Sequence, residues 1–232
     1  MSVRETIKIG QIEIPKYEFP SNIDEALNAY IRECKIDRGY VAFVDIERPE
    51  LISDAGIKSD LMRLYAAIRE LEHYPDDGFA SLGVANALAE LEDIEGIRMV
   101  LTSLEAAGPL NLYAVWDDDP MFHLAWYLAD FKHYDESIES YRKSLTKTYN
   151  HGKWVVWTHL GSVYHELGQF ERAEQCYQEA LTLCELEPKR ERFDSSEKES
   201  VIRTLLNQAT CKQPFTGRRI RHGVKLQPSE NS

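Results

Sequence analysis

The chain has little cysteine: four residues among 232, with no CxxC pair. Cys34, Cys176, Cys184 and Cys211 are too few and too scattered for a disulfide framework, so we expect buried free thiols. Long hydrophobic runs are also missing, because no apolar stretch approaches the ~20 residues that span a bilayer. The N-terminal segment MSVRETIKIG lacks the apolar core of a secretory signal. These absences argue against a membrane partner and predict a cytoplasmic location.

Familiar catalytic and nucleotide-binding motifs are missing too, since the chain has no G-x-S-x-G, no P-loop and no G-x-G-x-x-G. His165 and Glu166 are not followed by the second histidine of H-E-x-x-H. His159 and His165 would lie on different faces of a helix, so they cannot share a metal. Three adjacent aspartates at 117–119 lack the alternating spacing of a calcium loop. We therefore expect no metal, no cofactor and no enzyme, with an enzyme of dispersed catalytic residues as an alternative.

Acidic residues are in excess, and the formal net charge is −12. Residues 212–232 run against this trend with five basic residues and one acid, so residues 1–211 carry −16. Such an acidic body repels phosphate backbones, which argues against nucleic acid as the main partner and favours a basic one. We expect residues 212–232 to be a basic, flexible tail that can lie on the acidic body as a loose competitor in cis.

Strand and helix patterns mix in residues 1–57, which we interpret as an N-terminal extension. Isoleucines at positions 7, 9, 12 and 14 alternate with polar residues around Gly10, which predicts a small hairpin. A helix is predicted from Asn22 to about Cys34. The β-branched and aromatic run at 40–44 slightly favours a short strand.

Helical periodicity dominates residues 58–211, which we interpret as one helical repeat domain. Apolar residues three and four apart predict helices over 58–72, 79–91, 94–107, 119–131, 135–148, 154–167, 170–187 and 196–210. Short polar breaks separate these segments, and Asp119 followed by Pro120 is a typical helix start. Helices joined by short connections predict antiparallel hairpins, and their near-regular spacing suggests a repeat.

The strongest pattern is at 157–188, where a W-x2-L-G-x2-Y motif is followed by small and aromatic residues at fixed offsets. The motif comprises Trp157, Leu160, Gly161 and Tyr164, followed by Ala173, Tyr177 and Ala180. The small residues stand where two antiparallel helices must approach closely. This segment resembles a tetratricopeptide repeat, and weaker copies lie 36 residues and a further 40 residues upstream, so that the resemblance covers about 79–188. The helix over 196–210 resembles the capping helix of such arrays.

The resemblance implies an all-α protein in which antiparallel helix hairpins form a right-handed superhelix, closed by the capping helix. It also implies a non-enzymatic adaptor that binds a partner protein or peptide in a concave groove lined by the first helix of each pair. The groove positions implied for this sequence are Phe79, Leu82, Asn86, Glu90, Asp119, Phe122, Trp126, Asp130, Thr158, Ser162, His165 and Glu166.

The implied groove is aromatic and acidic, which fits a basic or apolar segment. It offers no lysine of the kind with which one subfamily grips a C-terminal carboxylate. Helix packing is an alternative role for Phe122 and Trp126, and helix capping is an alternative role for Asp119. An alternative function is that of an immunity-type inhibitor or chaperone that sheathes one basic partner. The sequence does not indicate an oligomeric state.

Overall fold

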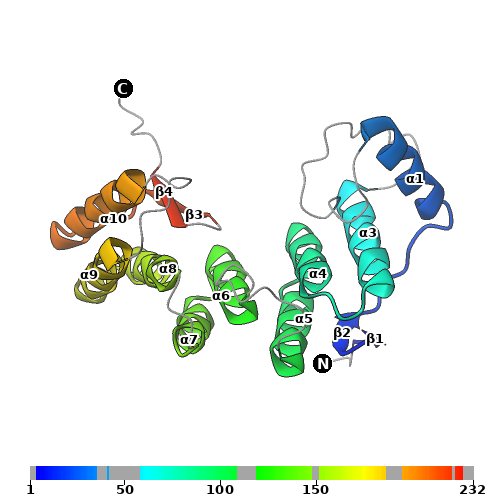
Figure 1. Ribbon diagram of the computed structural model, residues 1–232, viewed down its shortest axis with the longest axis horizontal. Helices are drawn as coiled ribbons and strands as arrows, with labels where there is room; N and C mark the ends of the chain where they lie inside the picture. Colours follow the sequence, from blue (N-terminus) through cyan, green and yellow to red (C-terminus); the bar gives the residue numbers. More distant parts are fainter. Residues whose placement is uncertain are drawn as a thin grey trace. The chain divides into compact units, whose positions relative to one another are not determined.

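The computed structural model describes residues 4–35, 41, 58–108, 119–147, 152–186, 195–220 and 223–226. The chain divides into two compact units, residues 1–113 and 114–232, and each is described by itself. Helices make up most of both units (Figure 1), which confirms the predicted all-α class. The strand predicted at 40–44 lies outside the described residues except for Val41. Among the described helices, none is long and apolar enough to cross a membrane.

The first unit begins with the predicted hairpin of β1 (Thr6–Ile9) and β2 (Ile12–Pro15). The strands pair antiparallel, with Ile9 opposite Ile12, and the turn places Gly10 at a φ of 57°. A side chain at Gly10 would also meet the backbone oxygen of Pro75, so this position needs glycine for two reasons. The isoleucines of β2 are buried, and this strand packs along α5.

Four helices complete the described part of the first unit: α1 (Ile23–Cys34), α3 (Ser59–His73), α4 (Gly78–Glu90) and α5 (Ile94–Ala107). Their bounds agree closely with the predicted ones. Helix α4 packs against both α3 and α5, and for this reason apolar and small side chains surround most of its circumference. Helix α1 packs against α3 through a cluster that includes Leu27, Tyr30 and Met62.

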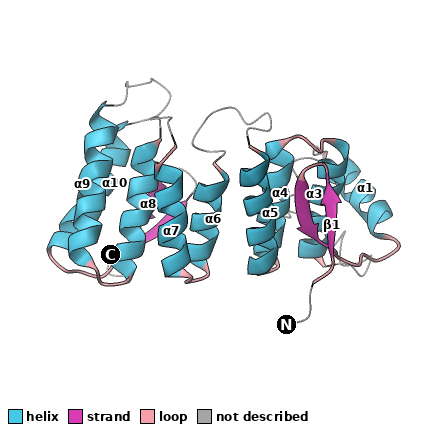
Figure 2. Cartoon of the chain, turned by 90° about the horizontal axis from the view of Figure 1, so that it is seen from below, coloured by secondary structure: helices cyan, strands magenta, loops and turns pink. Residues whose placement is uncertain are grey.

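The second unit is a row of five described helices: α6 (Pro120–Asp130), α7 (Tyr134–Leu145), α8 (Lys153–Glu166), α9 (Phe170–Leu186) and α10 (Ser195–Thr210). Each packs against the next, and Figure 2 shows these helices running side by side. Between α6 and α7 the chain turns at Lys132, with a φ of 64°, and between α8 and α9 it turns at Gly168, with a φ of 69°. Left-handed residues of this kind end one helix and allow the next to fold back antiparallel.

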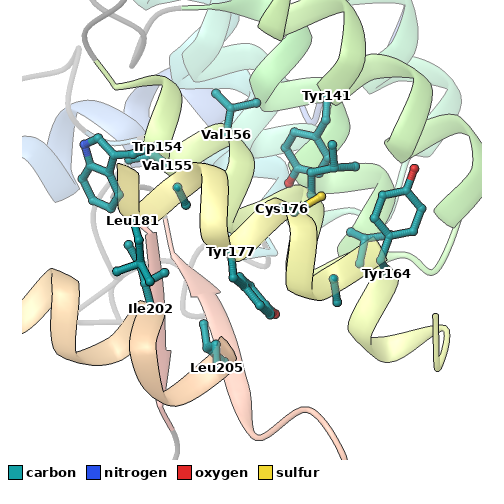
Figure 3. Packing of buried hydrophobic residues seen from close by; sticks show 14 of the residues in the cluster. Tyr141, Trp154, Val155, Val156, Tyr164, Cys176, Tyr177, Leu181, Ile202 and Leu205 are labelled. Carbon is teal, nitrogen blue, oxygen red and sulfur yellow. The ribbon is translucent and has the colours of Figure 1, made fainter. Parts of the chain in front are cut away.

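One apolar cluster joins the helices of the second unit (Figure 3). Tyr141 of α7 and Tyr177 of α9 are both fully buried in it. Leu181 of α9 packs in the same cluster as Ile202 and Leu205 of α10. Helix α10 therefore covers the apolar side of α9, as expected of a capping helix.

The end of the chain differs from the predicted flexible tail. Strands β3 (Gly217–Ile220) and β4 (Gly223–Leu226) form an antiparallel hairpin, with Arg219 opposite Val224. The hairpin contacts α8 and α10 (Figure 1). This correction has a tertiary cause, because the hairpin is held by partners on helices far away in the sequence.

Candidate protein-binding site

The helix pair α8–α9 positions the site, and its packing follows the repeat pattern. The motif residues Leu160 and Tyr164 of α8 are almost fully buried. Ala173 and Ala180 of α9 are completely buried. Small residues at these points let α8 and α9 approach closely. Because one side of α8 packs against α9, a different side of α8 is left to face α6.

That remaining face, together with the neighbouring face of α6, carries five of the predicted groove residues. We call this surface the α6–α8 face and define it by Trp126 and Asp130 of α6 and by Ser162, His165 and Glu166 of α8. Asp130 and Glu166 are the last residues of their helices. The tertiary structure thus brings together side chains that lie up to 40 residues apart in the sequence.

The acidic part of this face is occupied by Arg219 from β3. Nη1 of Arg219 donates to Oε1 of Glu166 at 2.8 Å, and Nη2 donates to Oδ1 of Asp130 at 3.3 Å. Nη1 also lies 3.4 Å from Oγ of Ser162. The arginine side chain is 6% exposed, against 23% for Glu166 and 49% for Asp130. A nearly buried guanidinium therefore faces two carboxylates.

The ionisation of these groups reflects both burial and their mutual contact. Burial raises the pKa of Asp130, and the neighbouring positive charge of Arg219 only partly opposes this shift. Burial alone would lower the pKa of Arg219, but Tyr141, Glu166 and Asp130 raise it above its ordinary value. The arginine is therefore charged at any physiological pH and compensates the two carboxylates.

His165 joins the face to the segment that precedes the hairpin. Its Nδ1 lies 3.3 Å from the hydroxyl of Tyr177, and its Nε2 lies 2.8 Å from the backbone oxygen of Gln213. The ring of Phe215 lies 5.7 Å from the imidazole ring. Burial lowers the pKa of His165, although the Gln213 contact opposes this shift. A neutral imidazole then donates from Nε2 to the carbonyl of Gln213 and accepts at Nδ1.

An aromatic layer lies behind the face, between α6 and α8. The Phe122 ring packs edge-on against His159 at 5.2 Å, and Nδ1 of His159 lies 3.2 Å from the Tyr141 hydroxyl. The half-buried ring of Trp126 stacks on Tyr127, with centroids 5.7 Å apart. The contact between Phe122 and His159 therefore packs α6 directly against α8.

Six of the twelve predicted residues are buried rather than exposed on a surface: Leu82, Asp119, Phe122 and Thr158, and also Ser162 and His165 of the α6–α8 face. Asp119 caps α6, because its Oδ1 accepts from the backbone N–H of Met121 at 3.0 Å and its Oδ2 accepts from the hydroxyl of Ser144. Thr158 donates to the backbone oxygen of Trp154. The sequence allowed helix packing as an alternative role for Phe122 and helix capping as an alternative role for Asp119, and the structure shows both of these roles.

The remaining predicted residues, Phe79, Asn86 and Glu90, lie with Leu82 on α4 in the first unit. Phe79 is 37% exposed, and Glu90 pairs with Arg63 at 3.6 Å. These residues belong to the first unit, whereas the α6–α8 face belongs to the second. Their role in binding remains a prediction.

Sequence reasoning missed two residues of the site. Arg219 was assigned to a flexible tail, and Tyr134, whose pKa is raised by burial and by its contact with Glu166, was not singled out. Glycines at 217 and 223 on either side of a short Arg-Arg-Ile segment are a weak hairpin signal that was available in the sequence.

Within the described residues, no group of three or more potential metal ligands comes together.

Comparison with known proteins identifies the repeat. The family model described as "Tetratricopeptide repeat" matches residues 154–185, which span nearly all of α8 and α9. One solved structure with a similar chain is titled "Crystal structure of MamA protein", with 12% identity, 82% of this chain and 88% of that chain covered, and a TM-score of 0.41. A search among curated proteins finds no match. The chain thus carries a tetratricopeptide repeat over α8 and α9, as the pattern from Trp157 onward predicted.

Proposed function

We propose that this chain is a non-enzymatic protein-binding module, and that its α6–α8 face binds a basic or apolar segment of a partner protein. Repeats of stacked helix pairs present continuous surfaces to which partners bind, and their chemistry depends on the side chains those surfaces carry. Here the first helix of each pair, α6 and α8, supplies the surface. The face combines the half-buried ring of Trp126 with the carboxylates of Asp130 and Glu166.

One observation carries this proposal: the face already holds a basic side chain. Arg219 lies against Asp130 and Glu166 with most of its side chain removed from water. Desolvating a guanidinium is costly unless charged acceptors replace the lost water, and these two carboxylates do so. A surface that can accommodate an arginine of its own chain has the chemistry to accommodate one from a partner.

Affinity capture with the full chain from extracts of the source organism, followed by mass spectrometry, would identify a candidate partner. The test itself is a titration of that purified partner against variants of the face. Trp126→Ala and Glu166→Ala should each weaken binding by at least ~10-fold, since truncating a central interface residue costs more than 1 kcal/mol. Glu179→Ala is the matched control, because Glu179 is an exposed acid on α9, outside the face.

Circular dichroism should show that all three variants keep the helical fold. Equal binding by wild type, face variants and control would contradict the proposal and direct attention to α4 or to the N-terminal hairpin. A single, salt-sensitive basic partner bound one to one would favour the inhibitor or chaperone alternative. Turnover of a substrate would overturn the non-enzymatic assignment.

A further inference from the structure

We infer that Asp130, Glu166 and Ser162 form a guanidinium-binding site for an arginine of a partner segment, and that the chain's own β3–β4 hairpin fills this site with Arg219 until the partner displaces it. The inference rests on the proposed function, because it names the side chain that the α6–α8 face would recognise. It adds that the face carries an internal ligand.

The site is built from helices, and the hairpin supplies only the cation. Asp130 ends α6, Glu166 ends α8, and Ser162 lies one turn before Glu166. The hydroxyl of Ser162 donates to the backbone oxygen of His159 at 2.6 Å, which fixes its lone pairs for an incoming donor. The backbone positions of all three acceptors are therefore set by α6 and α8 and not by the hairpin.

The geometry selects arginine over lysine. Separate nitrogens of Arg219 reach Glu166 and Asp130, at 2.8 and 3.3 Å, so that one planar group bridges two carboxylates on different helices. A guanidinium presents its donors in a fixed fork, whereas an ammonium is a compact and more strongly hydrated point charge. An empty site would leave two carboxylates with their charge uncompensated, and an arginine relieves this repulsion.

The internal ligand does not satisfy all of its own donors. Nε of Arg219 is buried and has no hydrogen-bond partner within the described part of the chain. The contacts to Asp130 and Ser162 are at the long end of hydrogen-bond distances. A buried donor without an acceptor carries a desolvation penalty. An arginine on a partner segment that also supplies an acceptor for Nε would bind the same carboxylates more favourably.

The hairpin is also small enough to exchange. Each of its strands has four residues, and a two-stranded hairpin alone is at best marginally stable in water. Besides Arg219, its attachment includes the partly buried side chains of Phe215 and Leu226. Ile202 and Leu205 of α10 pack in the cluster with α9, so the capping helix has apolar contacts of its own besides those to the hairpin.

An internal ligand lowers the apparent affinity of every external one. When the site is open for one tenth of the time, the measured dissociation constant is ~10 times the intrinsic value. A partner that binds this face must therefore bring an arginine that competes with Arg219. Changes that release the hairpin will raise affinity without altering the face itself.

The experiment uses the full chain and, as the probe, a labelled synthetic peptide with the sequence of residues 213–226. Fluorescence anisotropy measures binding of the peptide to wild type, to Arg219→Ala and to Arg218→Ala. Arg218 is the matched control, since it precedes Arg219 on β3, carries the same charge and is exposed. We expect the Arg219→Ala chain to bind the peptide ~10-fold more tightly than wild type, and the Arg218→Ala chain to bind like wild type.

A second measurement follows displacement directly. Amide hydrogen exchange of residues 217–226 is recorded in wild-type chain labelled with ¹⁵N, so that its mass differs from that of the added peptide. Binding of the peptide should remove protection from the chain's own hairpin. The same peptide with the change Arg219→Lys should bind at least ~5-fold more weakly than the unchanged peptide, because a single ammonium does not bridge both carboxylates.

Two results would overturn the inference. One is equal peptide affinity of the Arg219→Ala and Arg218→Ala chains; the other is peptide binding that leaves the chain's own hairpin protected. Neither result contradicts the proposed function if binding of a partner protein is still weakened by changes at Trp126 and Glu166. The proposed function is contradicted if a partner protein binds the Trp126 and Glu166 variants as tightly as wild type, irrespective of the peptide affinities.

Discussion

Gly161 of α8 lies directly against the ring of Tyr177 on α9, and an ideal Cβ built on this glycine would come within 2.7 Å of Cε1 of the tyrosine. Cβ of Cys176 would be 3.1 Å away. Tyr177 is completely buried, so its ring has no free space into which to retreat. The close approach of α8 and α9 inferred from the repeat pattern is therefore a contact between a glycine and an aromatic face.

Gly161→Ala should destabilise the protein even though alanine is the better helix former by ~1 kcal/mol. The clash with Tyr177 should outweigh this gain and leave a net loss of about 1 kcal/mol, and Gly161→Leu should lose about 3 kcal/mol. Urea unfolding followed by circular dichroism measures both losses. Combining Gly161→Ala with Tyr177→Leu should recover part of the loss, because the second change removes the ring. Purely additive effects would mean that the two residues do not meet.

Removing the Asp119 cap of α6 should cost a large amount of folding stability. Its replacement by alanine would leave the N–H of Met121 and the hydroxyl of Ser144 without their acceptor in a buried place. We expect Asp119→Ala to lose about 2–3 kcal/mol. Asp77 is the matched control, since it caps α4 through the N–H of Phe79 at a more exposed position, and Asp77→Ala should lose about 1 kcal/mol. Equal losses in thermal or urea unfolding would contradict the role given to burial.

The first unit should show an acid-dependent stability through Asp93. Burial raises the pKa of this carboxyl, but hydrogen bonds from Arg4 and Tyr17 outweigh burial and bring it below its ordinary value of 3.8. Because the folded pKa is depressed, the stabilisation is complete above this value and is lost as the pH falls through the folded pKa. Asp93→Asn should therefore be less stable than wild type at pH 7, by about 1 kcal/mol, with a smaller difference at pH 3.

The control for Asp93 is Glu5→Gln, which removes an exposed ion pair with Lys16. Its stability should differ little from that of wild type at either pH, because exposed pairs are strongly solvated. Urea unfolding at pH 7 and pH 3 measures all three proteins. A gap between Asp93→Asn and wild type that stays constant with pH would show that the carboxylate is not the titrating group.

The cysteines should differ sharply in reactivity. Burial raises the pKa of Cys176 to about 12, and Cys184 is also buried, whereas Cys211 is exposed. The thiolate is the reactive form, so iodoacetamide at neutral pH should modify Cys211 in the folded protein and leave Cys176 and Cys184 intact. Mass spectrometry of digested protein identifies the modified residues, and all should react in urea. Modification of Cys176 before unfolding would contradict its placement in the core.

The helices could be predicted from the sequence because their signals are local. Apolar residues three and four apart define the buried stripe of each helix, and Asp119 followed by Pro120 marks the start of α6. The N-terminal hairpin was equally readable from alternating isoleucines around Gly10. The motif from Trp157 to Tyr164 identified the tetratricopeptide repeat, because its small and large residues report how two adjacent helices pack.

The exposure of individual side chains could not be predicted so well. Phe122 and Thr158 were placed on a binding surface, yet both are buried, and Phe122 packs in the cluster that joins α6, α7 and α8. A helix in the middle of a row contacts neighbours on more than one side, so its buried residues are not confined to a single apolar stripe. Which face stays open depends on the angle at which the next pair packs, and that angle is not a property of one helix.

By itself the sequence determined the helices, the N-terminal hairpin, the repeat and the acidic character of the body, all of which follow from local spacing and composition. Only the tertiary structure decided that Arg219 lies between Asp130 and Glu166, and that the tail forms a hairpin there. The physical reason is the distance along the chain. These residues lie 53 and 89 positions from Arg219, so their encounter depends on how the helices stack and not on any pattern within a segment.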